Sequence, residues 1–368
     1  MKTLFILTKR NIKMFFKDTP MFLSSLISPA IVLVLYMVFL SNVYKGSFER
    51  NLPELVKLSE EVVNGFVAGQ LVSSLIAVTC VTVGFSTNFM MVQDKANRTI
   101  SDINVTPVKS NIVALSYYFA SIVATLIVCF VTLGLGLIYL AVAGWYLTAV
   151  DVLLLFVDVI ILSLFGTALS SVIHFFLSTQ GQISVVGTVV GVCYGFLCGA
   201  YMPMSEFGEG LRDVMTFFPG TYGTCLVRNH AMNGAIEAIS DELTTQFNNE
   251  ALTAEVVKEF QDAFDLNIYF LDNKVSTPVM YGVIIGVIVL LVGLYVLFNF
   301  LKAKNPNFGV IKKKSKKSKE KTENVELTDS LKDAESVVEV VAEDNADVEI
   351  TEKTEVDGVE NTTDQSQE

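Results

Sequence analysis

Six long apolar segments most strongly constrain how this chain can fold. They cover about residues 21–43, 66–92, 112–143, 152–177, 183–202 and 279–301. A helix of about 20 apolar residues crosses the hydrocarbon core of a bilayer, where every backbone polar group must be satisfied internally. With 52% hydrophobic and only 17% charged residues, the chain is too apolar for a soluble protein of 368 residues. The sequence therefore predicts an all-α membrane protein with six transmembrane helices.

The positions of lysine and arginine predict the orientation of these helices. Seventeen basic residues precede the first segment, follow the second or follow the sixth, whereas seven lie in the loops on the opposite side. Short loops that are rich in lysine and arginine stay in the cytoplasm. We therefore expect a multi-pass protein of the cell membrane, with both termini and the loop at residues 93–111 in the cytoplasm.

The remaining segments divide the chain further. In residues 1–19 the basic side chains gather on one side of a helical wheel and apolar ones on the other, which predicts an amphipathic interfacial helix. Residues 20–302 form the six-span domain, whose external region at 204–277 includes one or two amphipathic surface helices within 236–265. The basic segment 303–321 either binds anionic lipid or anchors the topology. Residues 322–368 carry sixteen acids and two lysines, which predicts a disordered tail.

The loop at residues 93–111 is polar but has a helical pattern. Ala96, Ile100 and Ile103 recur at helical spacing. Pro107 ends any such helix near Val105, because proline disfavours the α conformation of the preceding residue. The loop is therefore predicted to contain a short amphipathic helix between two spans, placed to transmit a push from a soluble partner into the membrane.

The sequence lacks the common motifs for nucleotide binding, zinc-dependent hydrolysis and paired cysteines. It has no G-x-x-x-x-G-K-[ST] loop, no H-E-x-x-H pair and no C-x-x-C among its five cysteines. We therefore expect no catalytic, cofactor-binding or metal site, no nucleic-acid partner, and no enzymatic activity of the chain itself. Any nucleotide would have to be bound by a separate subunit.

The fifth apolar segment carries a repeat of small residues. Glycine recurs every four residues at Gly187, Gly191, Gly195 and Gly199. Such a stripe lets another helix backbone approach closely. Two interpretations remain open, namely packing within one subunit and an interface that slides or separates during transport.

Asp158 is the one acid well inside a predicted span. Charge inside a bilayer is costly, so such acids usually face a partner or a water-filled cavity. We expect Asp158 to have a structural partner or to line a cavity. Proton coupling is the alternative, although no second buried ionisable residue is apparent that would complete a relay.

Two motifs resemble the ABC-2 type exporter permeases. The loop at 93–111 is similar to the family's coupling segment, approximately E-x-x-x-G-T-L-E-x-L-L-x-T-P-V, with matches at Thr99, Ile100, Ile103, Thr106, Pro107 and Val108. Arg98, Ser101 and Asn104 depart from it, with Arg98 in place of the glycine. A second resemblance, to G-x-x-x-P, N-P-x-x-Y and a distal arginine, rests on Gly199, Pro203, Pro219, Tyr222 and Arg228, with Phe218 in place of the asparagine. Together the resemblance covers about residues 1–302.

The resemblance implies a function. Two such permeases, identical or paired with a sister chain, would bind two ATP-binding cassette ATPase subunits and move a substrate outward across a bacterial plasma membrane. ATP would be bound by the partner. The ATPase-coupling residues would be Asp94, Arg98, Ile100, Ile103, Thr106 and Pro107. Two other functions remain open, namely a membrane anchor or sensor without transport, and a proton-coupled carrier that uses Asp158.

Overall fold

The computed structural model describes residues 2–35, 46, 58–271 and 273–305. Most of these residues are helical. The elements are α1 (Lys2–Lys17), α2 (Thr19–Leu35), α4 (Glu60–Ala96), α5 (Thr99–Asn104), α6 (Ser110–Ala143), α7 (Ala149–Phe176), α8 (Gln180–Leu197), the 3-10 helix η2 (Met204–Glu206), α9 (Glu209–Thr216), α10 (Pro219–Phe247), α11 (Glu250–Ala263), the strands β1 (Tyr269–Phe270) and β2 (Asn273–Lys274), and α12 (Thr277–Lys304).

Five helices within the described ranges are long and apolar enough to cross a membrane, namely α4, α6, α7, α8 and α12. They correspond to five of the six predicted spans. The other predicted span begins in α2, and its residues 36–43 lie outside the described residues, as do the predicted tail at 322–368 and almost all of the basic segment 303–321. The predicted helix at residues 1–19 is present as α1, while its place at a membrane surface stays a prediction.

Local sequence explains where several helices begin. The Ser59 hydroxyl accepts a hydrogen bond from the Val62 amide at the start of α4. Capping boxes start α7, between Thr148 and Asp151, and α8, between Thr179 and Gln182. Each box satisfies amides that have no partner within the helix.

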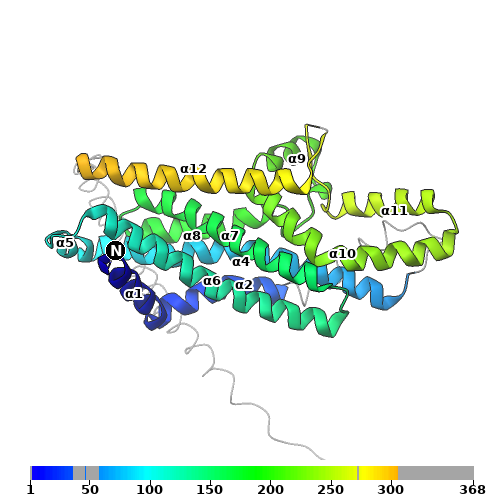
Figure 1. Cartoon of the computed structure of the whole chain (residues 1–368), viewed down its shortest axis with the longest axis horizontal. Helices are drawn as coiled ribbons and strands as arrows, with labels where there is room; N and C mark the ends of the chain where they lie inside the picture. Colours follow the sequence, from blue (N-terminus) through cyan, green and yellow to red (C-terminus); the bar gives the residue numbers. More distant parts are fainter. Residues whose placement is uncertain (1, 36–45, 47–57, 272, 306–368) are drawn as a thin grey trace, which may run out of the picture. The chain divides into compact units, whose positions relative to one another are not determined.

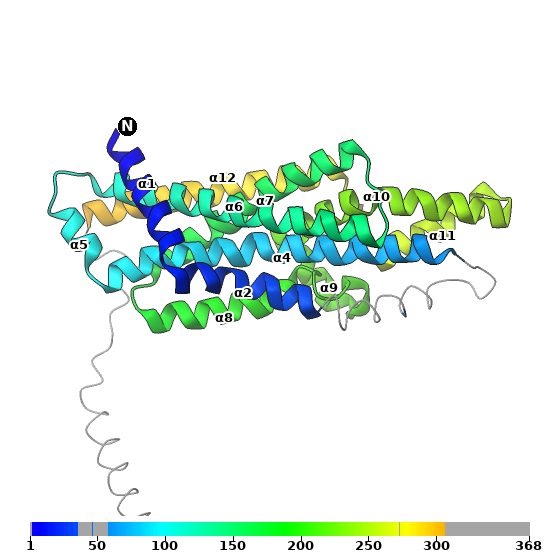
Figure 2. The same cartoon turned by 90° about the horizontal axis from the view of Figure 1, so that it is seen from below.

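Helix α4 is the centre of the bundle. It contacts α2, α6, α7, α8 and α10, and in Figure 2 it runs between the layer of α6, α7 and α12 and that of α2 and α8. Its buried residues include polar ones, of which Asn88 joins three helices. The Asn88 amide donates to Gly84 and Thr167 carbonyls, and its oxygen accepts from Ser121 and Ser171.

Helices α4 and α7 approach each other closely at a pair of glycines. A Cβ atom added to Gly84 would lie 3.0 Å from backbone atoms of Gly166 and Thr167. A Cβ added to Gly166 would lie 2.8 Å from the Cys80 carbonyl oxygen. Only glycine therefore permits this crossing.

Helix α10 is longer than the sequence pattern predicts. The expected surface helices at 236–265 are the second half of α10 and all of α11, but α10 already begins at Pro219. It packs against α4, α7 and α12, so the first half of α10 belongs to the bundle. Because its apolar residues contact neighbours on several sides, they do not form the single stripe that marks a surface helix.

Candidate functional site

The predicted short helix of loop 93–111 is present as α5, at the same end of the bundle as α1 (Figure 1). Helix α4 ends at Ala96, and Arg98 then turns the chain with a left-handed φ of 64°. This conformation favours glycine, because a Cβ atom crowds the following carbonyl oxygen. The glycine of the ABC-2 motif falls at the position of Arg98, so this chain makes the same turn with a less suitable residue.

The residues of α5 and its flanks divide into an inner and an outer set. Ile100, Ile103 and Val108 are half-buried and pack on a cluster from α1, α2, α4 and α6 that includes Phe15 and Tyr117. The outer residues are exposed, namely Arg98, Ser101, Asp102, Val105, Thr106 and Pro107. Val105 is the most exposed large apolar side chain of the loop, at 88%. The two isoleucines thus attach α5 to the bundle, and the outer residues form its free surface.

Asp94 is buried and fixes the end of α4 to two other helices. Its carboxylate accepts a 2.5 Å hydrogen bond from the Tyr117 hydroxyl of α6 and forms an ion pair with Arg10 of α1, at 3.5 Å. Next to Arg10, the Asn11 amide donates to the Ser116 hydroxyl on α6. The sequence singled out Asp94 but indicated neither Tyr117 nor Arg10 as its partner.

The four glycines of the repeat have different surroundings. Gly187 lies against the Phe89 ring of α4, and Gly195 lies against the Tyr201 ring. The Tyr201 hydroxyl donates to the Gly191 carbonyl, whereas a Cβ on Gly191 would meet no atom within 4 Å. Gly199 lies beyond the end of α8 with a φ of 67°, so it ends the helix instead of extending its stripe. Gly187, Gly195 and Gly199 therefore have neighbours within this chain at their Cβ positions, whereas the Cβ position of Gly191 is open.

Asp158 has two partners that are distant in sequence. Its carboxylate accepts a 2.5 Å hydrogen bond from the Tyr281 hydroxyl of α12 and lies 2.6 Å from the His230 Nδ1 of α10. The His230 and Tyr281 rings stack at 6.5 Å. The expectation of a structural partner agrees with this arrangement. The sequence indicated no second buried ionisable residue beside Asp158; the structure places the part-buried side chain of His230 there, from 72 residues away in the chain.

Arg228, from the second motif, is fully buried and joins three segments. Its guanidinium donates to the Gly199 carbonyl, at 2.8 Å, and to the Asp265 carboxylate, at 3.2 Å. Asp265 also accepts from the Met204 amide. Burial raises the pKa of Asp265 from its ordinary value to about 6, and the Arg228 charge opposes this rise.

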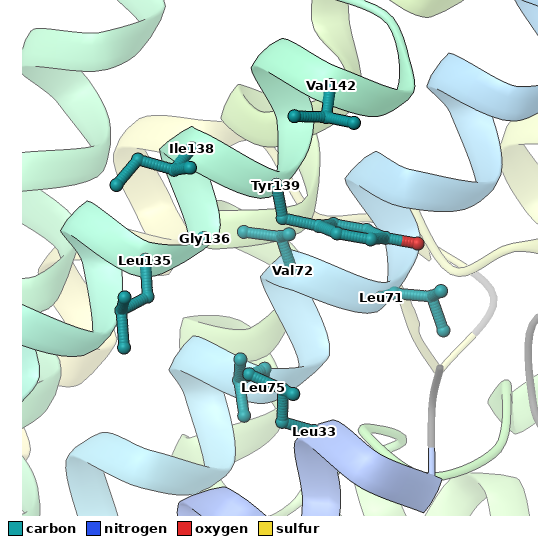
Figure 3. Close-up of a pocket in the computed structure, with 9 residues that line it drawn as sticks. All are labelled: Leu33, Leu71, Val72, Leu75, Leu135, Gly136, Ile138, Tyr139 and Val142. Carbon is teal, nitrogen blue, oxygen red and sulfur yellow. The ribbon is translucent and has the colours of Figure 1, made fainter. Parts of the chain in front are cut away.

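An apolar groove of about 410 Å³ lies between α2, α4 and α6 (Figure 3). Leu33, Leu71, Leu75 and Leu135 line it together with Tyr139, which extends from α6 toward α4. Apart from the Tyr139 hydroxyl, the side chains that line the groove are apolar and offer dispersion contacts. Among the residues that the structure describes, no group of three or more His, Cys, Asp or Glu side chains is arranged to hold a metal ion.

Comparison with known proteins identifies the family. Residues 2–230 match the family model of the ABC-2 type transporter, which covers more than half of the chain. A separate comparison with curated proteins found no match. The match includes α5, the glycine repeat of α8 and the Arg228 motif, and with the apolar helices it indicates a multi-pass membrane protein. The chain belongs to the ABC-2 type transporter family.

Proposed function

We propose that this chain is the membrane subunit of an ATP-driven exporter, and that α5 is the element through which a separate ATPase subunit moves it. The single observation that carries the proposal is the division of α5 into two sets of residues. Ile100 and Ile103 attach it to the bundle, while Asp102, Val105 and Pro107 stay exposed. A short helix that is fixed on one side and free on the other suits a docking element.

The residues expected to couple to the ATPase take different roles in this proposal. Arg98, Thr106 and Pro107 belong to the exposed surface that would contact the partner. Asp94, Ile100 and Ile103 hold that surface in place from the inside. Two copies of the permease, or one copy with a sister chain, would carry two ATPase subunits and form the translocation path, and ATP would be bound by the partner only.

The proposal also orients the chain. The basic residues of α1 and of the α4–α6 loop lie at the end that carries α5. Loops rich in lysine and arginine remain cytoplasmic. The α5 end would therefore face the cytoplasm, where ATP is available, and the substrate would leave at the opposite end.

The test uses one exposed residue of α5. Val105→Asp places a charge on the proposed docking surface, and because Val105 is 88% exposed the fold should tolerate it. We expect the variant to insert normally, to lose co-purification of the ATP-binding subunit in mild detergent, and to lose ATP-dependent export from vesicles. The matched control is Leu271→Asp directly after β1, where the side chain is 68% exposed. Unchanged co-purification in Val105→Asp, or no ATP-binding subunit with the wild type, would contradict the proposal.

A proton-coupled carrier is the second candidate function, and one observation favours it. Asp158 and His230 are two ionisable groups 2.6 Å apart on different helices, an arrangement that can hold or release a proton. The carrier requires transport to follow a proton gradient without ATP and to stop in Asp158→Asn. Transport that depends on ATP and is indifferent to the gradient would exclude it.

A further inference from the structure

The last residues of α4 send neighbouring side chains in different directions. Asp94 contacts α1 and α6, as described above. Lys95 reaches α7, where its Nζ atom donates to the carbonyl oxygens of His174, Phe175 and Leu177 at 2.9, 3.1 and 3.2 Å. The end of α4 that leads into α5 is thus joined to three other helices by two consecutive residues.

The three carbonyls lie where α7 ends. His174 and Phe175 belong to its last turn, and Leu177 is its C-cap. The last carbonyls of a helix have no partner within it, and they form the negative end of the helix dipole. An ammonium group satisfies these carbonyls and is attracted by the dipole. The Lys95 charge also lies 5.8 Å from the centre of the Phe175 ring.

The same contact reaches the start of the next helix. Thr179 caps α8, so only Ser178 separates Leu177, the C-cap of α7, from the first residue of the α8 capping box. Phe89 of α4 packs on Gly187 of α8, so α8 also contacts α4 directly. A movement of the α7 end would therefore be passed directly to α8.

We propose that Lys95 is the positioning residue that transmits a displacement of α5 to the α7–α8 connection, so that these segments move together. The inference rests on the proposed function, because it assigns a path to the push of the ATPase. Three residues separate Lys95 from the start of α5, namely Ala96, Asn97 and Arg98. A shift of α5 therefore acts on Lys95 over a very short length of chain.

The fold itself does not depend on Lys95 alone. Helices α4 and α7 also meet at the Gly84–Gly166 crossing and through the Asn88 hydrogen bond to the Thr167 carbonyl. Loss of the ammonium group should therefore leave the two helices packed together, with Val92 and Leu177 still in one apolar cluster, and remove only the hydrogen bonds at their ends. This separates a role in transmission from a role in folding.

The experiment compares three variants in vesicles with the ATP-binding subunit that co-purifies with the wild type. Lys95→Met keeps the length of the side chain and removes all three donated hydrogen bonds, whereas Lys95→Arg keeps a cation. Lys302→Met is the matched control, because its Nζ atom lies over the same Phe175 ring, at 5.3 Å. We expect Lys95→Met to bind the ATPase and hydrolyse ATP as the wild type does, and to transport about tenfold more slowly, within the usual range of coupling effects. Lys95→Arg should restore most of the transport, and Lys302→Met should retain it.

A distance measurement gives a readout that a purely structural role would not change. Spin labels are placed at Asn97→Cys, between α4 and α5 and outside the proposed docking surface, and at Gly181→Cys on α8, both exposed positions, with exposed Cys193 replaced by serine. Trapping the ATPase with a non-hydrolysable ATP analogue should leave this distance unchanged in the wild type and change it in Lys95→Met, because α5 then moves alone. Normal transport in Lys95→Met, or an unchanged distance in that variant, overturns the inference and leaves the proposed function intact. Absence of an ATP-binding subunit from the wild type overturns both.

Discussion

Two arginine–aspartate pairs hold opposite parts of this molecule, and they differ in their access to solvent. Arg228 and Asp265 lie 3.2 Å apart with side chains that are 1% and 5% exposed. Arg10 and Asp94 lie 3.5 Å apart, and the Arg10 side chain is 32% exposed. A buried pair cannot separate without leaving a charge that has no partner, whereas a partly exposed arginine can exchange its contact for water. The Arg228 pair is therefore suited to a fixed junction, and the Arg10 pair to one that opens and closes.

The largest expected effect is a loss of stability when the buried pair is broken, compared with a second variant in which the partly exposed pair is broken. Arg228→Met leaves the Asp265 carboxylate buried and uncompensated, which should destabilise the protein by about 3–5 kcal/mol. Arg10→Met should lower stability by less than about 1 kcal/mol, because Arg10 is partly exposed. Thermal midpoints in detergent check both values, with the folded fraction measured by size-exclusion chromatography. Equal losses in the two variants would remove the distinction between the pairs.

The second prediction concerns the pH dependence of the buried pair. The pKa of Asp265 is about 6 in the folded protein and 3.8 in its ordinary state, so the folded state binds the proton more tightly. The stability that this provides is fully present below about pH 4 and is lost as the pH rises to about 6, a change on the order of 3 kcal/mol. Thermal midpoints of the wild type and Asp265→Asn between pH 4 and 7 measure it. The two pH profiles should differ over this range, and parallel profiles would contradict the prediction.

The third prediction concerns the neutral partner of Asp94. Tyr117→Phe removes a hydrogen bond to a buried carboxylate, and bonds to charged groups contribute about 1.5–3 kcal/mol. We expect a loss in this range and a weaker attachment of α5. Hydrogen exchange at the amides of residues 97–106 should become faster. Tyr118→Phe, on the next residue of α6, serves as the control, and equal effects of the two changes would argue against a specific role of the Asp94 contact.

The smallest expected effect is a gain in stability at the turn between α4 and α5. Arg98→Gly relieves a left-handed residue at the start of α5 and should stabilise the protein by up to about 1 kcal/mol. Arg98→Ala removes the same charge and keeps a Cβ atom, so it should give no such gain. A higher thermal midpoint in Arg98→Gly alone checks the origin of the effect. A similar rise in both variants would assign it to the charge.

Features that depend on local pattern were predictable from the sequence. The apolar segments predicted six spans, and five of these correspond to helices of sufficient length within the described residues. Pro107 together with the spacing of Ala96, Ile100 and Ile103 predicted the short helix of the loop. The T-P-V motif led to the family that the comparison identifies. In each case neighbouring residues carry the signal, because helix periodicity and proline effects act over a few positions.

Features that depend on distant contacts were not predictable. Asp158 and His230 are 72 residues apart, and nothing in the pattern of either segment selects the other. The inward direction of Asp94 depends on Tyr117 and Arg10 in two other helices. The close crossing of α4 and α7 uses one glycine from each helix, which no repeat within a single helix reveals.

The Gly84–Gly166 crossing has a mechanical consequence. Counting residues along α4, Gly84 lies about 18 Å from the Ala96 end and about 36 Å from the Glu60 end, at 1.5 Å per residue. If α4 tilts as a rigid rod about this crossing, a small sideways displacement at the α5 end becomes a displacement in the opposite direction, about twice as large, at the other end. The crossing is then an off-centre pivot, and a small displacement at one end of α4 becomes a larger displacement at its opposite end.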